Sequence, residues 1–553
     1  MFSKHPKGLV VAFFANMGER FGFYTMMAIL VLFLQAKYGL NAEKAGSIYS
    51  WFYFGIYALA LVGGLLADAT KKYKLVILLG IIIMLGGYGL LAIPGMSLEI
   101  TVALLFMIAL GNGLFKGNLQ AVVGQMYDDP KYSSLRDSAF MLFYMGINVG
   151  AFFAPFAATA IRNYMLKLNG YLHDGSLPSL CHQFNDGNLQ DVAVFQSLAD
   201  KVSLAGPVTD LAAFSNEYLD VFSRGYNYAF GIAALAMIIS LLVYVLFNRY
   251  LPSKRFEAKV EAGKEEVKMS WAEEKRRLGA LGLVFIVVIF FWMSFHQNGL
   301  TLTMFARDYT AKEVGGFTNI FFYLPSMLAF LLGVAGLVLL FIRKSSMTRK
   351  LMGGAMLVVG ALLTFFFYSG FPTMNAIEPE IFQSFNPLFI VALTFLVLGF
   401  FAWLNKRGME PSTPKKIGIG MIIAALGFLV VLVGSVSLMS PHELGGEPVL
   451  DDMRVSPYWL ISSYLVLTIA ELFLSPMGLS FVSKVSPPRF QGLMQGGWLG
   501  ATAIGNKLLF VGSFLWDRID LWQLWTIFVV CCLLSAAFIF SILKRLERAT
   551  KGA

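Results

Sequence analysis

The sequence predicts an all-α polytopic membrane protein, and three observations support this. Of its 553 residues, 57% are hydrophobic and only 14% are charged, and the mean hydropathy of +0.69 is far above that of water-soluble proteins of this size. Ionisable residues are rare inside the apolar runs. Fourteen such runs are long enough to cross about 30 Å of hydrocarbon. They lie near residues 8–36, 45–67, 75–93, 100–127, 138–161, 226–247, 278–305, 317–342, 351–369, 383–404, 417–439, 457–483, 491–515 and 521–543.

The net charge of +10 does not indicate nucleic-acid binding. The Lys and Arg residues lie in short loops beside the apolar runs, where they orient helices in a membrane. The three cysteines, Cys181, Cys531 and Cys532, have neither metal-ligand spacing nor the pattern of a disulfide framework. We therefore expect no metal site and no cofactor. No combination of nucleophile, base and orienting group indicates an enzyme.

The basic clusters predict the orientation of the helices. All of them fall on one side of the membrane, whereas loops on the other side include the acidic stretches 375–380 and 442–452. By the positive-inside rule both termini are then cytoplasmic. The basic clusters lie at 71–74, 249–277, 343–350, 406–416 and 544–545.

Two long polar breaks divide the chain. The first, over residues 162–224, is expected on the outer side of the membrane and includes a surface helix near Leu189 to Val202. The second, over residues 251–277, alternates Lys and Arg with Glu, which is typical of a linker between two six-helix halves. The predicted organisation is an N-terminal bundle over 1–250 with an outer loop over 162–224, a cytoplasmic linker over 251–277, and a C-terminal bundle over 278–553 with two extra helices at about 317–369.

The first apolar run contains a Glu–Arg pair at its middle. A carboxylate and a guanidinium each cost several kcal/mol inside a bilayer unless they are paired or face water. On helical spacing Asn16, Glu19, Arg20 and Tyr24 share one face. This face predicts the inner wall of a polar cavity, as in a transporter.

Other ionisable residues within the runs are few. Lys116 adds positive charge to the first half of the chain, and Glu471 places negative charge in the second. A cavity between the halves would be a dipole that suits a zwitterion, with its carboxylate near Arg20 and Lys116 and its ammonium near Glu471. Amino acids and short peptides are such zwitterions. Lys507 lies nearer an interface, where pairing that only holds helices together is an equal alternative.

Aromatic and polar residues inside the runs complete the predicted cavity wall. Each of them alone is weak evidence for a binding site, because buried aromatic and amide side chains commonly pack or hydrogen-bond between helices. The candidates are Tyr24, Tyr57, Asn148, Trp292, Asn386, Ser475 and Trp498.

The segment Asn16-Met-Gly-Glu-Arg-Phe-Gly-Phe-Tyr24 resembles the ExxERFxYY motif of the proton-dependent oligopeptide transporters, a family within the major facilitator superfamily. Further motifs along most of the chain also resemble this family. They are Gly63 to Asp68 followed by Lys71 and Lys72, Gly111 to Asn118, Phe140 to Phe152, Phe382 to Phe389, Glu471 to Ser480 and Gly497 to Asn506.

The resemblance implies a fold of two six-helix bundles that alternate access to a central site, here with two extra helices. It implies that Arg20, Tyr24 and Lys116 contact the peptide carboxylate and backbone, and that Glu471 holds the amino terminus. The residues that it implies as shaping the pocket are Tyr57, Asn148, Trp292, Asn386, Ser475 and Trp498.

The sequence departs from the family pattern. Asn16 replaces the first motif glutamate, Phe23 replaces a tyrosine, and His296 stands where the seventh helix usually carries an acid. The extra runs 317–342 and 351–369 follow the seventh family helix, whereas familiar bacterial members carry two extra helices before it.

These departures affect proton coupling. Asn16 can hydrogen-bond to Lys116 or Glu19 but cannot titrate. Glu19 is held ionised by two neighbouring cations, which makes it a counter-ion. His296 is either a proton carrier or a neutral, hydrogen-bonded core histidine. The candidates for proton coupling are Glu19, His296 and Glu471.

The sequence therefore predicts secondary active import of di- and tripeptides, by proton symport, across a lipid bilayer. A weakly coupled or proton-independent carrier, or an exchanger of another small anion or amphiphile, is the alternative on the same fold. A sensor without transport is a further alternative. The oligomeric state is left open.

Overall fold

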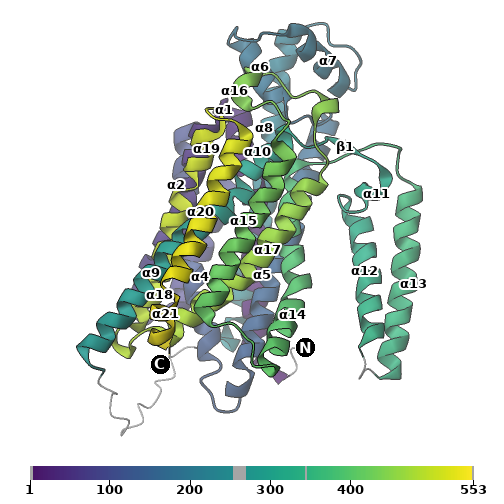
Figure 1. The fold of residues 1–553 in the computed structure, drawn as a ribbon. Helices are drawn as coiled ribbons and strands as arrows, with labels where there is room; N and C mark the ends of the chain where they lie inside the picture. The colour runs from purple at the N-terminus through teal and green to yellow at the C-terminus, as the bar shows by residue number, and fades with distance from the viewer. Residues whose placement is uncertain (1–3, 253–268, 343–345, 551–553) are drawn as a thin grey trace.

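The computed structural model describes residues 4–252, 269–342 and 346–550. Within these residues, fourteen helical spans are long and apolar enough to cross a membrane, as the sequence predicts. The two chain termini lie at the same end of the bundle, which we call the terminal end (Figure 1). The opposite end carries short helices and long connections, and we call it the capped end.

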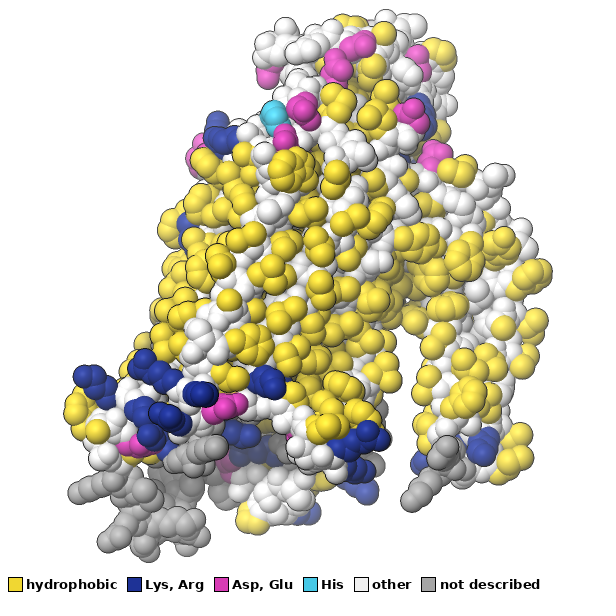
Figure 2. Space-filling model, viewed as in Figure 1, with side chains coloured by type: hydrophobic (Ala, Val, Ile, Leu, Met, Phe, Trp, Pro, Cys, Tyr) yellow, Lys and Arg dark blue, Asp and Glu magenta, His cyan; other side chains and the backbone are white. Residues whose placement is uncertain are grey.

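The surface follows the expectation for a membrane protein. Figure 2 shows hydrophobic side chains over the middle of the visible face, Lys and Arg near the terminal end, and most Asp and Glu near the capped end. The protein is an all-α polytopic membrane protein.

The N-terminal half has six spanning helices. The first of these helices ends at Gly39, which has a positive φ of 61°. This left-handed conformation is common for glycine and unfavourable for residues that have a Cβ atom. At the crossing of the second and fourth, a Cβ on Gly63 would lie 2.3 Å from the Gly113 carbonyl oxygen, so only glycine permits this approach. The six helices are α1 (Lys7–Tyr38), α2 (Ala42–Thr70), α3 (Tyr73–Leu91), α4 (Leu98–Gln125), α5 (Arg136–Leu168) and α8 (Leu211–Phe247).

The C-terminal half also has six spans, two of which are interrupted. The first of these breaks at a 3₁₀ turn that contains His296, and the other breaks after Lys507. The spans are α9 (Trp271–Phe295) with η4 (His296–Gly299) and α10 (Thr301–Asp308); η5 (Pro379–Ser384) with α14 (Phe385–Lys406); α15 (Thr413–Ser435); α17 (Tyr458–Val485); α18 (Gln491–Lys507) with α19 (Phe510–Trp516); and α20 (Leu521–Ser541).

The two extra helices form a separate hairpin. Strands β1 (Glu313–Val314) and β2 (Asn375–Ala376) pair at its base, and α11 (Gly316–Asn319) precedes it. Helices α12 (Leu324–Phe341) and α13 (Met347–Ser369) stand beside the main bundle in Figure 1. They pack on each other through glycines, since a Cβ on Gly360 would lie 2.3 Å from the Gly333 nitrogen.

The structure differs from the predicted segment boundaries at two places. Helices α5 and α8 extend into the predicted loop 162–224, so the connection is shorter and includes α6 (Leu177–Asn185), which was not predicted, and α7 (Val192–Val202) near the predicted surface helix. In the predicted linker 251–277, residues 253–268 lie outside the described residues. Its last residues are the first turns of α9, which Ser270 caps through the Glu273 backbone N–H.

The remaining elements are short and connect the spans. They are η2 (Ser133–Leu135), η3 (Asn248–Tyr250), α16 (Pro441–Leu444), η6 (Asp451–Met453), η7 (Pro488–Phe490) and α21 (Leu543–Thr550).

Candidate substrate-binding site

The Glu–Arg pair of α1 is buried inside the N-terminal half. Glu19 is 0% exposed and Arg20 is 3% exposed, and their side chains form a two-contact ion pair. Asn112 of α4 donates a hydrogen bond to Glu19 Oε1 over 2.6 Å, and the Arg20 guanidinium lies 4.7 Å from the Phe23 ring centroid. Glu19 is therefore paired with Arg20 and hydrogen-bonded by Asn112.

Asn16 does not form the hydrogen bond that the sequence suggested. The sequence suggested a hydrogen bond to Lys116 or Glu19, but the buried Asn16 Nδ2 has no hydrogen-bond partner within the described part of the chain. Asn112 reaches Glu19 in its place because α4 packs against α1 there.

Lys116 lies one helical turn beyond Asn112 on α4 and is partly buried. Its ammonium is 4.5 Å from the ring centroid of Tyr57 on α2. Among the described residues it has no carboxylate partner and no hydrogen bond. The cation–π contact leaves the donors of this ammonium free for a ligand.

Glu471 of α17 is the corresponding acid of the C-terminal half. Its Oε2 accepts a hydrogen bond of 3.0 Å from Asn386 Nδ2, and the same amide also donates to Thr468 Oγ1 over 3.0 Å. No cation pairs with Glu471 in the regions that the structure describes. An uncompensated carboxylate inside a membrane protein is costly, so it favours a cationic ligand group.

The two halves bring these groups together. Tyr24 interacts electrostatically with both Arg20 on its own helix and Glu471 on the opposite half. Lys116 interacts in the same way with His296 of the opposite half. Electrostatic interactions therefore connect the predicted charged residues across the two halves.

His296 lies in an aromatic and amide environment. It is 7% exposed, its ring stacks on Trp292 with centroids 4.6 Å apart, and Tyr53 lies equally close. Its Nδ1 is 2.5 Å from Asn506 Oδ1. These contacts agree with a hydrogen-bonded histidine.

The remaining predicted residues differ in their surroundings. Trp498 packs against Gly478, where a Cβ would lie 2.1 Å from the indole. Asn148 donates to the Tyr144 carbonyl of its own helix, and Ser475 forms no hydrogen bond with another site residue in the described ranges. Lys507 bonds to Ser50 over 3.3 Å, which agrees with a role in holding helices together.

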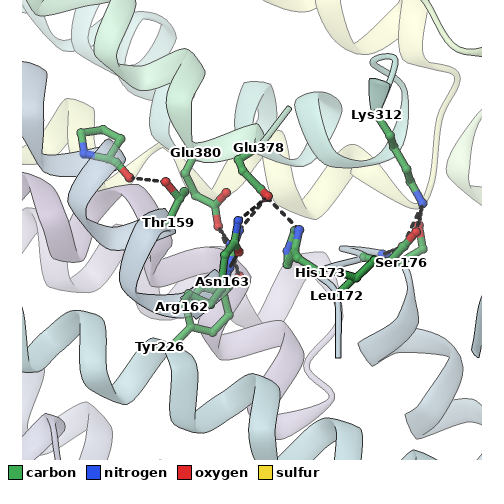
Figure 3. Close-up of polar contacts among 12 residues, drawn as sticks. Thr159, Arg162, Asn163, Leu172, His173, Ser176, Tyr226, Lys312, Glu378 and Glu380 are labelled. Atoms are coloured by element: carbon green, nitrogen blue, oxygen red, sulfur yellow. Dashed lines mark hydrogen bonds and ion pairs between the residues drawn. The ribbon is translucent and has the colours of Figure 1, made fainter. Parts of the chain in front are cut away.

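A second polar network joins the halves nearer the capped end, and we call it the lock. Arg162 of α5 forms ion pairs with Glu380 and, over 2.6 Å, with Glu378, both of which precede α14 (Figure 3). His173 Nδ1 is 2.7 Å from Glu378, and the Tyr226 hydroxyl lies beside Glu380. The side chains of Arg162 and Glu380 are both 0% exposed.

A further ion pair supports the lock. Lys312 donates to both carboxylate oxygens of Asp174 over 2.8 and 2.7 Å (Figure 3). Because Lys312 follows α10 and Asp174 follows α5, this pair also joins the two halves at the capped end. Burial alone would raise the pKa of Asp174, but the Lys312 ammonium and the Ser176 backbone N–H hold that pKa below its usual value. Burial likewise opposes ionisation of Glu378, yet His173 and Arg162 keep the pKa of Glu378 lowered.

Sequence reasoning did not identify the lock or the polar partners of the central site. Arg162 was assigned to a loop, and the acidic stretch 375–380 served only to orient the helices. The missed neighbours in the central site are Tyr53, Asn112, Thr468 and Asn506. An arginine at the end of an apolar run, with acids before another run, was the available signal for the lock.

One group of side chains at the capped end has metal-ligating chemistry. His442, Glu443 and Asp520 place ligand atoms within 4.8 Å of one another. Both acids already cap helices through backbone N–H groups, and the three residues lie outside the central site. We assign no metal to them.

The fold and the central site define a secondary transporter of the major facilitator type, with buried charged side chains on both of its six-helix halves. The sequence matches the family PTR2, described as the POT family, over residues 73–271 and 364–520, which is more than half of the chain. The chain belongs to the POT family.

Individual relatives agree over the whole length. The chain is 27% identical to the peptide transporter YePEPT of Yersinia enterocolitica, with 100% of this chain and 97% of the relative aligned. It is 26% identical to the uncharacterized transporter YclF of Bacillus subtilis, covering 100% of this chain and 96% of the relative.

Solved structures show the same fold. A crystal structure of a POT family transporter in complex with 5-aminolevulinic acid has a TM-score of 0.68 at 20% identity, covering 99% of this chain and 98% of that one. The peptide transporter POT in complex with sulfate has a TM-score of 0.66 at 22% identity, covering 99% and 96%.

Proposed function

We propose that this protein imports di- and tripeptides by alternating access, with the peptide held as a zwitterion between the two halves. The observation that carries the proposal is the pair of uncompensated groups: Lys116 on the N-terminal half and Glu471 on the C-terminal half. A peptide carboxylate satisfies the first and a peptide ammonium satisfies the second. Family membership and the similarity to the Yersinia peptide transporter support the same function.

Binding of both peptide ends couples ligand to conformation. Each end contacts a different half, so the ligand stabilises states in which the halves approach each other around it. Aromatic side chains, Tyr57 and Trp292 among them, provide flat walls for the peptide between the charged poles. Tyr24, which interacts electrostatically with Arg20 and Glu471, orients the peptide backbone.

The terminal end is proposed to face the cytoplasm. The Lys and Arg side chains gathered there support this orientation by the positive-inside rule (Figure 2). The capped end then faces outward, and the lock closes the central site on that side. A bacterial inner membrane is the proposed location.

An inward proton movement is proposed to drive accumulation, with Glu471 and His296 as the groups that exchange protons. Glu19 does not serve, because it is occupied by Arg20 and Asn112. A weakly coupled carrier is the second candidate. Two observations favour it: Asn16 cannot titrate, and His296 contacts an amide instead of a carboxylate.

The test is uptake of labelled dialanine by proteoliposomes with and without an inward proton gradient. We expect accumulation by the wild-type protein, and loss of accumulation in Lys116→Ala and Glu471→Ala with folding retained. We call Lys116 and Glu471, which hold the two ends of the peptide, the clamp. Lys507→Gln is the matched control, since it removes a membrane cation outside the clamp. Accumulation by either clamp variant at the wild-type level would refute the clamp.

A further inference from the structure

A cavity of about 510 Å³ lies at the capped end, between the two halves and under α6. Its volume is in the range of pockets that hold small ligands. Residues of the lock, His173 and Tyr226, are part of its wall, as is Pro379 between the two lock glutamates. None of the predicted central-site residues lines it, so the cavity and the central site are distinct.

The charged lining is predominantly acidic. Both guanidinium groups in the wall are already engaged: Arg307 contacts both oxygens of Asp308 and Gln35, and Arg454 donates to backbone carbonyls of Arg307 and Thr310. The acids of the wall outnumber these cations. They are Asp186, Asp308, Glu447 and Asp517.

Two polar side-chain groups of the wall lack partners among the described residues. The carboxylate of Asp517, directly after α19, has no ion pair or hydrogen bond there, although the Asp517 backbone N–H donates to the Leu515 carbonyl. The hydroxyl of Tyr309, a wall residue that is 1% exposed, also has no hydrogen-bond partner there. The Tyr309 hydroxyl interacts electrostatically with Asp308 and Asp517, so these groups are neighbours.

The environment of Asp517 favours a cationic ligand. Burial and the Asp308 carboxylate raise the pKa of Asp517, because both disfavour its negative charge, and they outweigh the opposite influence of Arg307 and Arg518. An ammonium group that donates to the Asp517 carboxylate would relieve this cost. The adjacent indole of Trp516 provides an apolar surface beside it.

We propose that this cavity is a second peptide site, which takes the ammonium end of a di- or tripeptide at Asp517 while the lock below it is closed. The inference rests on the proposed function, because it assumes a peptide substrate. Its consequence is that substrate is collected at the capped end before the central site becomes accessible from that side. Opening of the lock then connects the two sites.

The test uses the full-length protein with a reporter thiol in the cavity. Ser179 is exposed and lines the cavity, and Ser179→Cys changes one atom. We expect dialanine to slow modification of this thiol by a charged maleimide, and N-acetyl-dialanine, which has no ammonium, to give no protection. The chain without Ser179→Cys measures the background from the native cysteines.

Three further variants locate the protecting peptide. Protection should persist in Glu471→Ala, which disables the central site. Asp517→Asn should raise the dialanine concentration for half-protection by about threefold to tenfold, as for a partly hydrated ion pair. Asp452→Asn, an exposed carboxylate outside the cavity, should leave it unchanged.

The outcomes separate the two proposals. Absence of protection in a protein that accumulates dialanine would overturn the second site and leave transport intact. Protection that disappears in Glu471→Ala and is unaffected by Asp517→Asn would also overturn it, because the signal would come from the central site. Failure of the wild-type protein to accumulate dialanine would instead contradict the proposed function.

Discussion

Arg162 and Glu380 form an ion pair in which both side chains are completely buried, although 218 positions separate them in the sequence. One residue belongs to the N-terminal half and the other to the C-terminal half. Burial makes such a pair costly to break by removing one partner, because the other charge is then left uncompensated. The pair therefore ties the two halves together near the capped end.

Removing the arginine should open the capped end. We expect Arg162→Ala to shift the conformational equilibrium by about 3 kcal/mol or more toward the state open there, since the buried Glu380 loses its ion-pair partner and Glu378 keeps, among the described residues, only His173 as an ion-pair partner. Spin labels at the exposed positions Val192 and Leu450, in a chain whose cysteines are replaced by serine, report this as a longer distance in pulsed EPR.

The control for the lock variant is Lys201→Ala. Lys201 pairs with Glu313 across the halves, but these side chains are 55% and 43% exposed, and such pairs contribute about 0–1 kcal/mol. Its distance distribution should match the wild type. Equal distributions for Arg162→Ala and the wild type would contradict the role of the lock.

The Asp174–Lys312 pair predicts a pH dependence of stability. The folded protein holds the pKa of Asp174 below the ordinary value of about 3.9, so its contribution is complete above that value and is lost as the pH falls through the folded pKa. We expect Asp174→Asn to destabilise by about 2 kcal/mol at neutral pH. The difference in melting temperature from the wild type should shrink below about pH 4. A difference that grows on acidification would contradict this assignment.

The extra hairpin is predicted to lie outside the transport path. Its helices have no ionisable side chain in their interiors and stand beside the bundle (Figure 1). We expect replacement of residues 324–369 by a short Gly–Ser linker to leave dialanine uptake intact, although expression falls. Phe322 is retained because its ring packs on Phe382, with centroids 5.1 Å apart. Loss of uptake in a folded deletion variant would overturn this prediction.

Proton coupling is tested at the two altered motif positions. Dialanine uptake is measured against external pH for the wild type, His296→Gln and Asn16→Glu. We expect His296→Gln to reduce gradient-driven uptake, because glutamine preserves hydrogen bonding and cannot titrate near neutrality. Asn16→Glu should increase gradient dependence by restoring an acid. An unchanged profile and undiminished uptake in His296→Gln would eliminate His296 as the carrier.

The spans and the charged poles could be predicted from the sequence. A bilayer requires long apolar helices, so the spans can be recognised from their amino-acid composition. An ionised side chain is costly inside a span, so the few that occur there indicate a functional site. Glu19, Arg20, Lys116 and Glu471 were identified for this reason. The structure confirms the membrane architecture and brings these residues toward one region.

The neighbours of the poles could not be predicted in the same way. Asn112 and Asn506 resemble the many amides that hydrogen-bond between helices, so only their three-dimensional neighbours distinguish them. The lock combines Arg162 with acids more than 200 positions away, and hydropathy contains no information on that pairing. The cavity beside Asp517 likewise depends on how α6 and the connections fold over the bundle.

The central claim is that a peptide ammonium binds Glu471 while its carboxylate binds the opposite half, and a double-mutant cycle tests this most directly. Binding of dialanine and N-acetyl-dialanine is compared in the wild type and Glu471→Gln, both carrying Asp517→Asn so that the capped-end cavity contributes little. We predict that acetylation weakens binding to the protein with Glu471 but has little effect on Glu471→Gln, with a coupling energy of about 1.5 kcal/mol or more. Additive effects, within about 0.5 kcal/mol, would contradict the clamp.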